Sequence, residues 1–284
     1  MKYRFIEASR AHHPVRSLCR TLGVSTSGYY AACARPPSAC AQRQERLTTR
    51  IRSIHAASRD TYGAPRVHTD LIAQGEDCCK NTVAKLMRRA GIVPKTVRRF
   101  RVTTDSRHTW WTAPNLVGRV FSASQPNVCW LTDITFIPTR QGWLYLAVIL
   151  DLYSRAVVGW AMGNRLNRWL AINALNMAIA QRASTPDILH SDRGSLYGVA
   201  EYRALLARHD IRQSMSRKAD CWDNAPMESF FHTLKTELVH HCDYPTRDAA
   251  RSSLFEYMEV FYNRQRRHST LNYEAPLAFE AMYP

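Results

Sequence analysis

Glu228 is an acidic residue beside the apolar face of a predicted helix, in the segment SRKADCWDNAPMESFFHTLKTEL that runs from Ser216 to Leu238. Four apolar residues recur at helical spacing and predict the face that packs on a core: Met227, Phe230, Leu234 and Leu238. Asn224 and Pro226 are typical of a helix start. Asn224, Glu228 and Lys235 share one face of this helix. Such a carboxylate and amine could bind a metal ion and a phosphate, whereas an isolated glutamate is ordinarily solvated.

Two aspartates occupy strand positions where acidic residues are depleted. Asp133 lies in the middle of NVCWLTDITFIPT (127–139), which is rich in β-branched and aromatic residues and predicts a strand. Asp192 follows the short apolar strand of DILHSDRGS (187–195), at the kind of strand end where α/β sheets bind ligands. His190 precedes it, and we expect the imidazole to contact a ligand residue rather than a metal.

Buried carboxylates are costly unless they are paired or bind a cation, and Mg²⁺ prefers oxygen ligands. We therefore predict that Asp133, Asp192 and Glu228 are metal ligands and catalytic residues. Two ions about 4 Å apart can activate a nucleophilic oxygen and stabilise a leaving oxygen in phosphodiester chemistry. Asp151 is the competing candidate, but it ends its strand in DLYSR, where bonding to Ser154 or Arg155 would explain it without a metal.

The composition points to an anionic partner. Lys and Arg number 39 against 23 Asp and Glu, a formal charge of +16, which favours nucleic acid or an anionic membrane surface. No run of about 18 apolar residues predicts a spanning helix, and the N-terminus lacks an apolar signal region, so a cytoplasmic protein is predicted. The eight cysteines are scattered without a Cys-x-x-Cys pair, which indicates neither a zinc ribbon nor a disulfide framework.

The positive charge is concentrated in residues 1–120, which carry a net +15, while residues 121–284 carry +1. Within the basic part, residues 15–37 and 61–95 each predict a helix-turn-helix, separated by a helix over about 41–58. On the last of these helices the outward side chains expected to contact DNA are Lys85, Arg88 and Arg89. The alternative is two short helical hairpins with solvated arginines.

Three adjacent strands followed by alternating helices and strands predict that the C-terminal part is a mixed α/β sheet flanked by helices. All-α helix-turn-helix segments precede it. We divide the chain into a first helix-turn-helix region, a second helix-turn-helix domain, a basic linker, and a catalytic core with a helical tail, at residues 1–58, 59–97, 98–120 and 121–284. In the tail, YNRQRRH (262–268) contributes two further candidate DNA contacts, Arg264 and Arg267.

Several motifs resemble the second-reading-frame (OrfB) transposases of bacterial insertion sequences, whose core is similar to retroviral integrases. They are WLTDIT, LDLYSRAVVGWAM, HSDRGSLY, DNAPMESFFHTLKTEL and YNRQRRHSTLNYEAPLAFE, preceded by the helix-turn-helix stretch YGAPRVHTDL with TVAKLMRRAGI. Asp133, Asp192 and Glu228 match the DDE triad of that family. The resemblance implies an RNase H-like core and Mg²⁺-dependent cleavage and transfer of DNA strands, with two ions expected and Mn²⁺ able to substitute.

These observations predict a DDE transposase that frees a 3′-OH at the element's end and joins it to target DNA. Two alternatives stay open: an RNase H-like nuclease that cuts without joining, and a DNA-binding regulator whose core is inert. The expected partners are the insertion-sequence ends, target DNA and further copies of the chain on DNA. The upstream-frame protein, or a frameshift fusion with it, is an additional candidate partner.

If the charge distribution reflects a division of labour, residues 1–118 should bind element-end DNA specifically and cut nothing. Residues 121–284 should bind DNA weakly and cut with little sequence preference. Affinity from phosphate neutralisation falls steeply with salt, so a salt titration of each fragment measures the division. A core fragment that binds element ends as tightly and specifically as the full chain would contradict this prediction, because recognition would then lie in residues 121–284.

Overall fold

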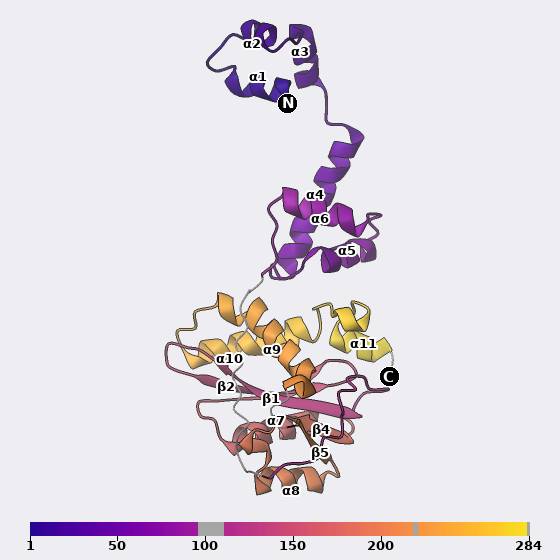
Figure 1. Ribbon diagram of the computed structural model, residues 1–284, viewed down its shortest axis with the longest axis vertical. Helices are drawn as coiled ribbons and strands as arrows, with labels where there is room; N and C mark the ends of the chain where they lie inside the picture. Colours follow the sequence, from indigo (N-terminus) through magenta and orange to yellow (C-terminus); the bar gives the residue numbers. More distant parts are fainter. Residues whose placement is uncertain (96–110, 218–220, 283–284) are drawn as a thin grey trace.

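The computed structural model describes residues 1–95, 111–217 and 221–282. Along the chain lie a first helical unit, a second helical unit and an α/β core (Figure 1). The first helical unit contains α1 (Lys2–Ser9), α2 (Val15–Thr21) and α3 (Thr26–Ala34) around buried Ile6, Cys19 and Tyr29. The helix-turn-helix expected at 15–37 is therefore present as α2 and α3, and α1, which the sequence reading did not assign, completes its core.

The second helical unit contains α4 (Ala39–Ala57), α5 (Ala64–Ala73) and α6 (Lys80–Arg89). Its core joins all three helices: Leu47, Ile51, Ile54, Tyr62, Val67, Leu71, Val83, Leu86 and Met87. The boundary that we expected at residue 58 falls inside this unit, because the apolar stripe of α4 packs on α5 and α6 rather than on the first unit.

The core contains a five-stranded sheet in the order β3-β2-β1-β4-β5. The strands are β1 (Cys129–Ile137), β2 (Leu144–Asp151), β3 (Val157–Gly163), β4 (Ile188–Ser191) and β5 (Arg212–Met215). β1, β2 and β3 are antiparallel neighbours, whereas β4 and β5 run parallel to β1. This confirms the predicted mixed α/β, RNase H-like class: short connections join the antiparallel strands, and helical crossovers join the parallel ones.

Helices cover both faces of the sheet (Figure 1). On one face lie α7 (Arg168–Gln181) and α8 (Ala200–Arg208), and on the other α9 (Ala225–Glu237), α10 (Arg247–Phe255) and a π-helical continuation of α10 (Glu256–Tyr262). Gly159 in β3 allows α7 to approach, since a Cβ there would lie 2.4 Å from the carbonyl oxygen of Ala174. The last helix is α11 (Pro276–Met282), and short 3₁₀ turns occupy Ser195–Tyr197, Cys221–Asn224, Val239–His241 and Ser269–Leu271.

The predicted basic linker over 98–120 is only partly described, because residues 96–110 lie outside the described ranges. Its described end belongs to the core. Ala113 and Val117 are buried there, and the Leu116 amide donates to the Ser214 hydroxyl at 2.9 Å. The core therefore begins before the predicted boundary at 121.

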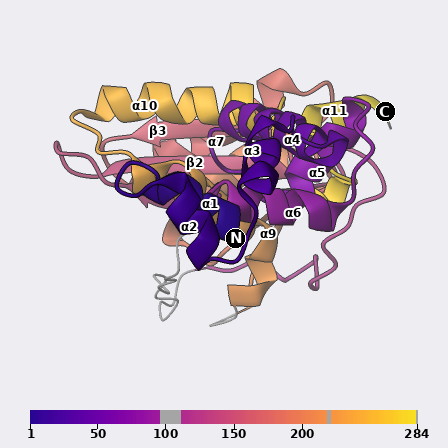
Figure 2. The ribbon, with the colours of Figure 1, turned by 90° about the horizontal axis from the view of Figure 1, so that it is seen from above.

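The second helical unit lies over the layer made by α9, α10 and α11, and the first helical unit lies farther out (Figures 1 and 2). The DNA-binding candidates of α6 are thus carried on the same side of the sheet as α9. Among the described residues, no helix is long and apolar enough to cross a membrane.

Candidate active site

Asp133 and Asp192 lie side by side at one level of the sheet. Thr132 pairs with Ser191 in the parallel register of β1 and β4, so the two aspartates come next on adjacent strands. Neighbouring strands are about 4.8 Å apart. Asp133 shares its strand face with Leu131, which packs in the core beneath α9. Asp133 therefore faces the layer that contains α9, and Asp192 follows the neighbouring strand at the same level.

Local backbone bonds orient both aspartates. The Ile134 amide donates to Asp133 Oδ1 at 2.7 Å, and the Gly194 amide donates to Asp192 Oδ1 at 2.8 Å. The glycine turn after β4 permits the second bond, because a Cβ on Gly194 would lie 2.9 Å from the same oxygen. The RG turn of HSDRGS thus holds the Asp192 carboxylate close to the strand end.

α9 brings Glu228 over these aspartates. The helix buries Met227, Phe230 and Leu234 against the sheet, which confirms the predicted stripe. The residue that precedes the helix is anchored on β1, because Asn224 Nδ2 donates to the Thr132 carbonyl oxygen at 3.4 Å. Glu228 follows one turn later and is half-buried.

Asp133 is affected electrostatically by the two other carboxylates. Burial, the Asp192 charge and the Glu228 charge raise the pKa of Asp133 well above its usual range, against the effect of the Ile134 amide. Burial also raises the pKa of Glu228. Lys235 lies two turns along α9, where burial lowers the pKa of its ammonium and the Asp133 charge opposes that effect. Asp192, Glu228 and Lys235 therefore all lie within electrostatic reach of Asp133.

The donor set can be tested for its fit to Mg²⁺. In the part of the chain that the structure describes, no three His, Cys, Asp or Glu side chains are grouped closely enough to hold a metal ion. The chemistry of the donors nevertheless fits, because all three are carboxylates and a cation would relieve the repulsion that raises the pKa of Asp133. A further oxygen acceptor lies nearby: the buried Oδ1 of Asn224 accepts no hydrogen bond from the described residues.

Asn224, Arg267 and His190 differ from their predicted roles. Asn224 is only 4% exposed, so its amide holds α9 on β1 instead of contacting DNA. The guanidinium of Arg267 is paired with Asp70 at 2.6 Å in the second helical unit, which removes it from the candidate DNA contacts. His190 is buried and bonds the hydroxyls of Ser214 and Ser216, and burial lowers its pKa to about 4. A neutral His190 therefore links β4 to β5 and the segment after it rather than supporting a metal ligand.

The remaining candidates lie where the sequence placed them. Lys85, Arg88 and Arg89 are exposed on α6 while Val83 and Leu86 are buried, and Arg264 is exposed in the tail. Asp151 is fully buried at the other end of the β1–β2 pair, opposite Trp130. Its carboxylate accepts from the backbone amides of Asn127, Tyr153 and Ser154, and its pairing with Arg182 completes a structural turn that needs no metal.

Two residues near the site were not predicted from the sequence. Tyr197 is fully buried, and its pKa is raised well above its usual range by burial and by the charges of Asp133 and Asp192. It belongs to HSDRGSLY, and a tyrosine five residues after an aspartate is not a pattern that predicts proximity to a site. Asp223 precedes α9 and is fully buried, although an acidic residue at a helix start is ordinarily solvated.

Asp223 accepts five N–H bonds from three residues in two segments of the chain. Arg217 donates through its amide, Nε and Nη2 at 2.8, 3.0 and 2.8 Å, Asn115 through Nδ2 at 2.9 Å, and Arg119 through Nε at 3.0 Å. The Arg217 guanidinium holds the pKa of Asp223 well below its usual range. The carboxylate thus ties the start of α9 to the segment before β1 and to the end of β5.

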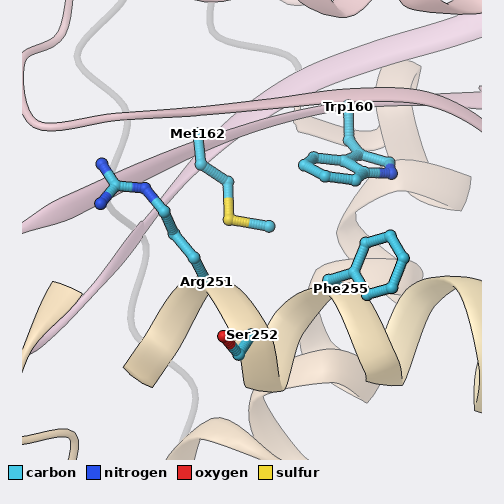
Figure 3. A pocket seen from close by; sticks show the side chains of 5 residues that line it. All are labelled: Trp160, Met162, Arg251, Ser252 and Phe255. Carbon is cyan, nitrogen blue, oxygen red and sulfur yellow. The ribbon is translucent and has the colours of Figure 1, made fainter. Parts of the chain in front are cut away.

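A surface hollow on the core is separate from this site. It is lined by Trp160 and Met162 of β3 and by Arg251, Ser252 and Phe255 of α10 (Figure 3). β3 is one of the two edge strands of the sheet, and β2 lies between it and β1. The hollow therefore has no part in positioning the carboxylates.

Comparison with known proteins identifies the family of each part of the chain. Residues 123–221 and 228–283 each match an integrase core domain family, and residues 42–100 match an HTH-like domain family. Transposase InsF for insertion sequence IS3A of Escherichia coli (strain K12) is 42% identical, over 99% of this chain and 98% of its own length. The 31 kDa protein of insertion element IS600 of Shigella sonnei is 43% identical, over 94% of this chain and 98% of its own length.

Two solved structures show weaker likeness. One is the simian T-cell lymphotropic virus intasome in complex with PP2A regulatory subunit B56 gamma, at 16% identity and a TM-score of 0.47, covering 81% of this chain and 74% of that chain. The other is the trimeric form of the HTLV-2 integrase catalytic core domain in complex with magnesium, at 17% identity and a TM-score of 0.44, covering 56% of this chain and 99% of that chain.

The fold, the acidic face of its sheet and the helix-turn-helix domain define a transposase with an integrase catalytic core. The sequence identity shared with InsF over nearly the whole chain also defines the family. The chain belongs to the IS3 family of insertion-sequence transposases.

Asp223→Asn should lower the free energy of unfolding at pH 7 by about 2 kcal/mol, the scale of lost hydrogen bonds to a charged group. Because the folded-state pKa of Asp223 lies below its unfolded value of about 3.9, its contribution is present at neutral pH and is lost on acidification. The difference between variant and wild type should therefore stay constant from pH 7 to about 5 and shrink as pH falls below about 4. Urea unfolding at several pH values measures it, with exposed Asp187→Asn as the control. A difference independent of pH would contradict this account.

Proposed function

We propose that this transposase hydrolyses a phosphodiester at the end of its insertion sequence and joins the freed 3′-OH to target DNA at Asp133, Asp192 and Glu228. The observation that carries the proposal is the register of β1 and β4. It places two aspartates on adjacent parallel strands, beneath a helix that supplies a third carboxylate. Acidic residues on three separate elements, of which two raise the pKa of the third together with burial, form an arrangement suited to divalent cations.

Mg²⁺ is the proposed cofactor, with two ions expected and Mn²⁺ able to substitute. The carboxylates of Asp133, Asp192 and Glu228 would hold it. When bound, such ions activate the attacking oxygen and stabilise the leaving oxygen of a phosphodiester.

The protein's own side chains orient the reactants. The Ile134 and Gly194 amides fix one oxygen of each aspartate, so the carboxylates are positioned before a substrate arrives. Lys235 places a cation on the same face of α9 as Glu228, where a DNA phosphate would lie beside the carboxylates. Lys85, Arg88 and Arg89 project from α6 toward solvent and would read the DNA end, while Arg264 would contact a phosphate.

The proposed partners are the element's ends, target DNA and further copies of the chain assembled on DNA. The upstream-frame protein, alone or as a frameshift fusion, is a further proposed partner. We further propose a cytoplasmic location, as predicted from the sequence.

The two alternatives make different predictions in one assay. An RNase H-like nuclease would release nicked products without joined ones, and a regulator with an inert core would bind the DNA and release neither. A DDE transposase would produce both, in a reaction that depends on Mg²⁺. Labelled element-end DNA incubated with target DNA and Mg²⁺ separates the three.

Asp192→Asn keeps the shape of the side chain and removes its charge. It should lower cleavage and joining by several orders of magnitude and leave DNA binding unchanged, and Asp133→Asn and Glu228→Gln should behave alike because residues of one metal site act as a unit. Single-turnover assays of both steps test this, with Asp187→Asn as a matched aspartate at the other end of β4. Near wild-type activity in any of the three would remove that residue from the site.

Lys235→Ala removes the cation beside Asp133 without changing the apolar stripe of α9. We expect joining to fall about tenfold, equivalent to about 1.4 kcal/mol of transition-state stabilisation. The salt slope of binding to element-end DNA should become shallower by about one, the effect of one lost phosphate contact. Arg208→Ala on α8, at the opposite face of the sheet, is the control. Unchanged joining and an unchanged slope would make Lys235 an ordinary surface lysine.

A further inference from the structure

The segment Glu256–Arg267 binds the second helical unit, although its arginines were expected to contact DNA. We propose that this segment, the tail latch, holds the second helical unit at a fixed position over the core and thereby determines which phosphodiester bond of the bound DNA end is cut. The inference rests on the proposed function, because it assigns a source of positional accuracy to that cleavage.

A single buried hydroxyl makes the central contact of the tail latch. Tyr62 lies between α4 and α5 and is 4% exposed. Its hydroxyl donates to the Gln265 carbonyl oxygen at 3.3 Å and accepts from the Arg267 amide at 2.7 Å. Backbone groups of the tail latch are therefore satisfied by a side chain of the DNA-binding unit, which fixes the two segments in one register.

Arg267 forms the second contact. Its Nε donates to Asp70 Oδ1 on α5 at 2.6 Å, and its Nη1 donates to the Tyr273 carbonyl oxygen at 2.9 Å. Arg66, one turn before Asp70, donates through Nε to the carbonyl oxygen of Arg267 at 2.9 Å. Both side chains of the ion pair are about four-fifths covered, at 19% and 22% exposure, so water competes little for it.

Arg59 forms a third contact at the other end of the tail latch. Its guanidinium pairs with Glu256 and lies over the ring of Phe261, 4.7 Å from the ring centre. Contacts at the start, middle and end of the segment restrict rotation as well as separation, because three points define an orientation.

The tail latch is also bonded to the catalytic helix. Arg266, adjacent to Arg267, is buried and donates through Nε and Nη2 to the Glu237 carboxylate on α9 at 2.8 and 2.7 Å. The Tyr257 hydroxyl donates to the same carboxylate at 2.7 Å. Successive arginines thus hold the DNA-binding unit and the helix that carries Glu228, so their relative position is set by short side-chain contacts.

This connection matters for a site-directed cut. Lys85, Arg88 and Arg89 lie on α6, in the same unit as the residues that contact the tail latch. Tyr62 shares one apolar core with α6, and Asp70 lies on α5. DNA bound by α6 therefore moves with that unit. If the unit could shift over the core, different phosphodiester bonds would reach the carboxylates.

The test uses the full chain with Tyr62→Phe and Asp70→Asn combined, and Asp77→Asn as an exposed acid of the same unit that should change nothing. Cleavage of end-labelled element-end DNA is mapped to single nucleotides, and DNA affinity is measured in parallel. We expect affinity within about twofold of wild type, cutting at the terminal bond reduced about tenfold, and new cuts at neighbouring bonds. In a separate variant, Arg267→Asp combined with Asp70→Arg should restore part of the accuracy lost by Arg267→Asp alone.

Cutting of the double variant that stays unchanged and confined to the terminal bond would overturn the proposal. Faster cutting at that bond would also overturn it, because the tail latch would then inhibit cleavage. A wild-type chain that does not cut would count against the proposed function. The tail latch is then tested by the dimensions of the chain in solution. Small-angle X-ray scattering should give a larger maximum dimension for the Tyr62→Phe, Asp70→Asn chain than for wild type. Equal dimensions, in a chain whose thermal unfolding is unchanged, would overturn the tail latch without reference to cleavage.

Discussion

Mutual repulsion among three carboxylates is the constraint on which this structure depends. Asp133 and Asp192 occupy adjacent positions on parallel strands, and Glu228 faces them from α9, so each ionised group raises the energy of the others. The fold holds them there with backbone amides and with the apolar face of α9, which supply no compensating positive charge of their own. We therefore propose that cations relieve this repulsion, of which Lys235 offsets only part.

The position of α9 follows from polar bonds at both of its ends as well as from its apolar stripe. At its start, Asp223 joins Arg217, Asn115 and Arg119, and at its end Glu237 is bonded to Arg266. Breaking a buried pair leaves an uncompensated charge and is destabilising, so these bonds favour one position of the helix. The placement of Glu228 thus depends on residues distant from the chemistry.

Local patterns made most strands and helices predictable. They also singled out Asp133 as a candidate, because an acidic residue inside an apolar strand is unusual whatever its partners. The roles of Asn224 and Arg267 were not predictable, since amides and guanidiniums serve DNA phosphates and buried protein acceptors equally well. The deciding partners lie far along the chain: Thr132 is 92 residues from Asn224, and Asp70 is 197 residues from Arg267. Asp223 was missed for the same reason, because its partners Asn115 and Arg119 lie 108 and 104 residues away.

The central claim is that Asp133, Asp192 and Glu228 bind catalytic metal ions, and anomalous X-ray scattering tests it most directly. Crystals of the full chain with element-end DNA and Mn²⁺ should show anomalous peaks within about 2.5 Å of the oxygens of these carboxylates, since hard divalent cations bind oxygen at 2.0–2.6 Å. The peaks should be absent from Asp151, which the structure satisfies with amides and Arg182. Manganese bound elsewhere, with the three carboxylates empty, would contradict the account.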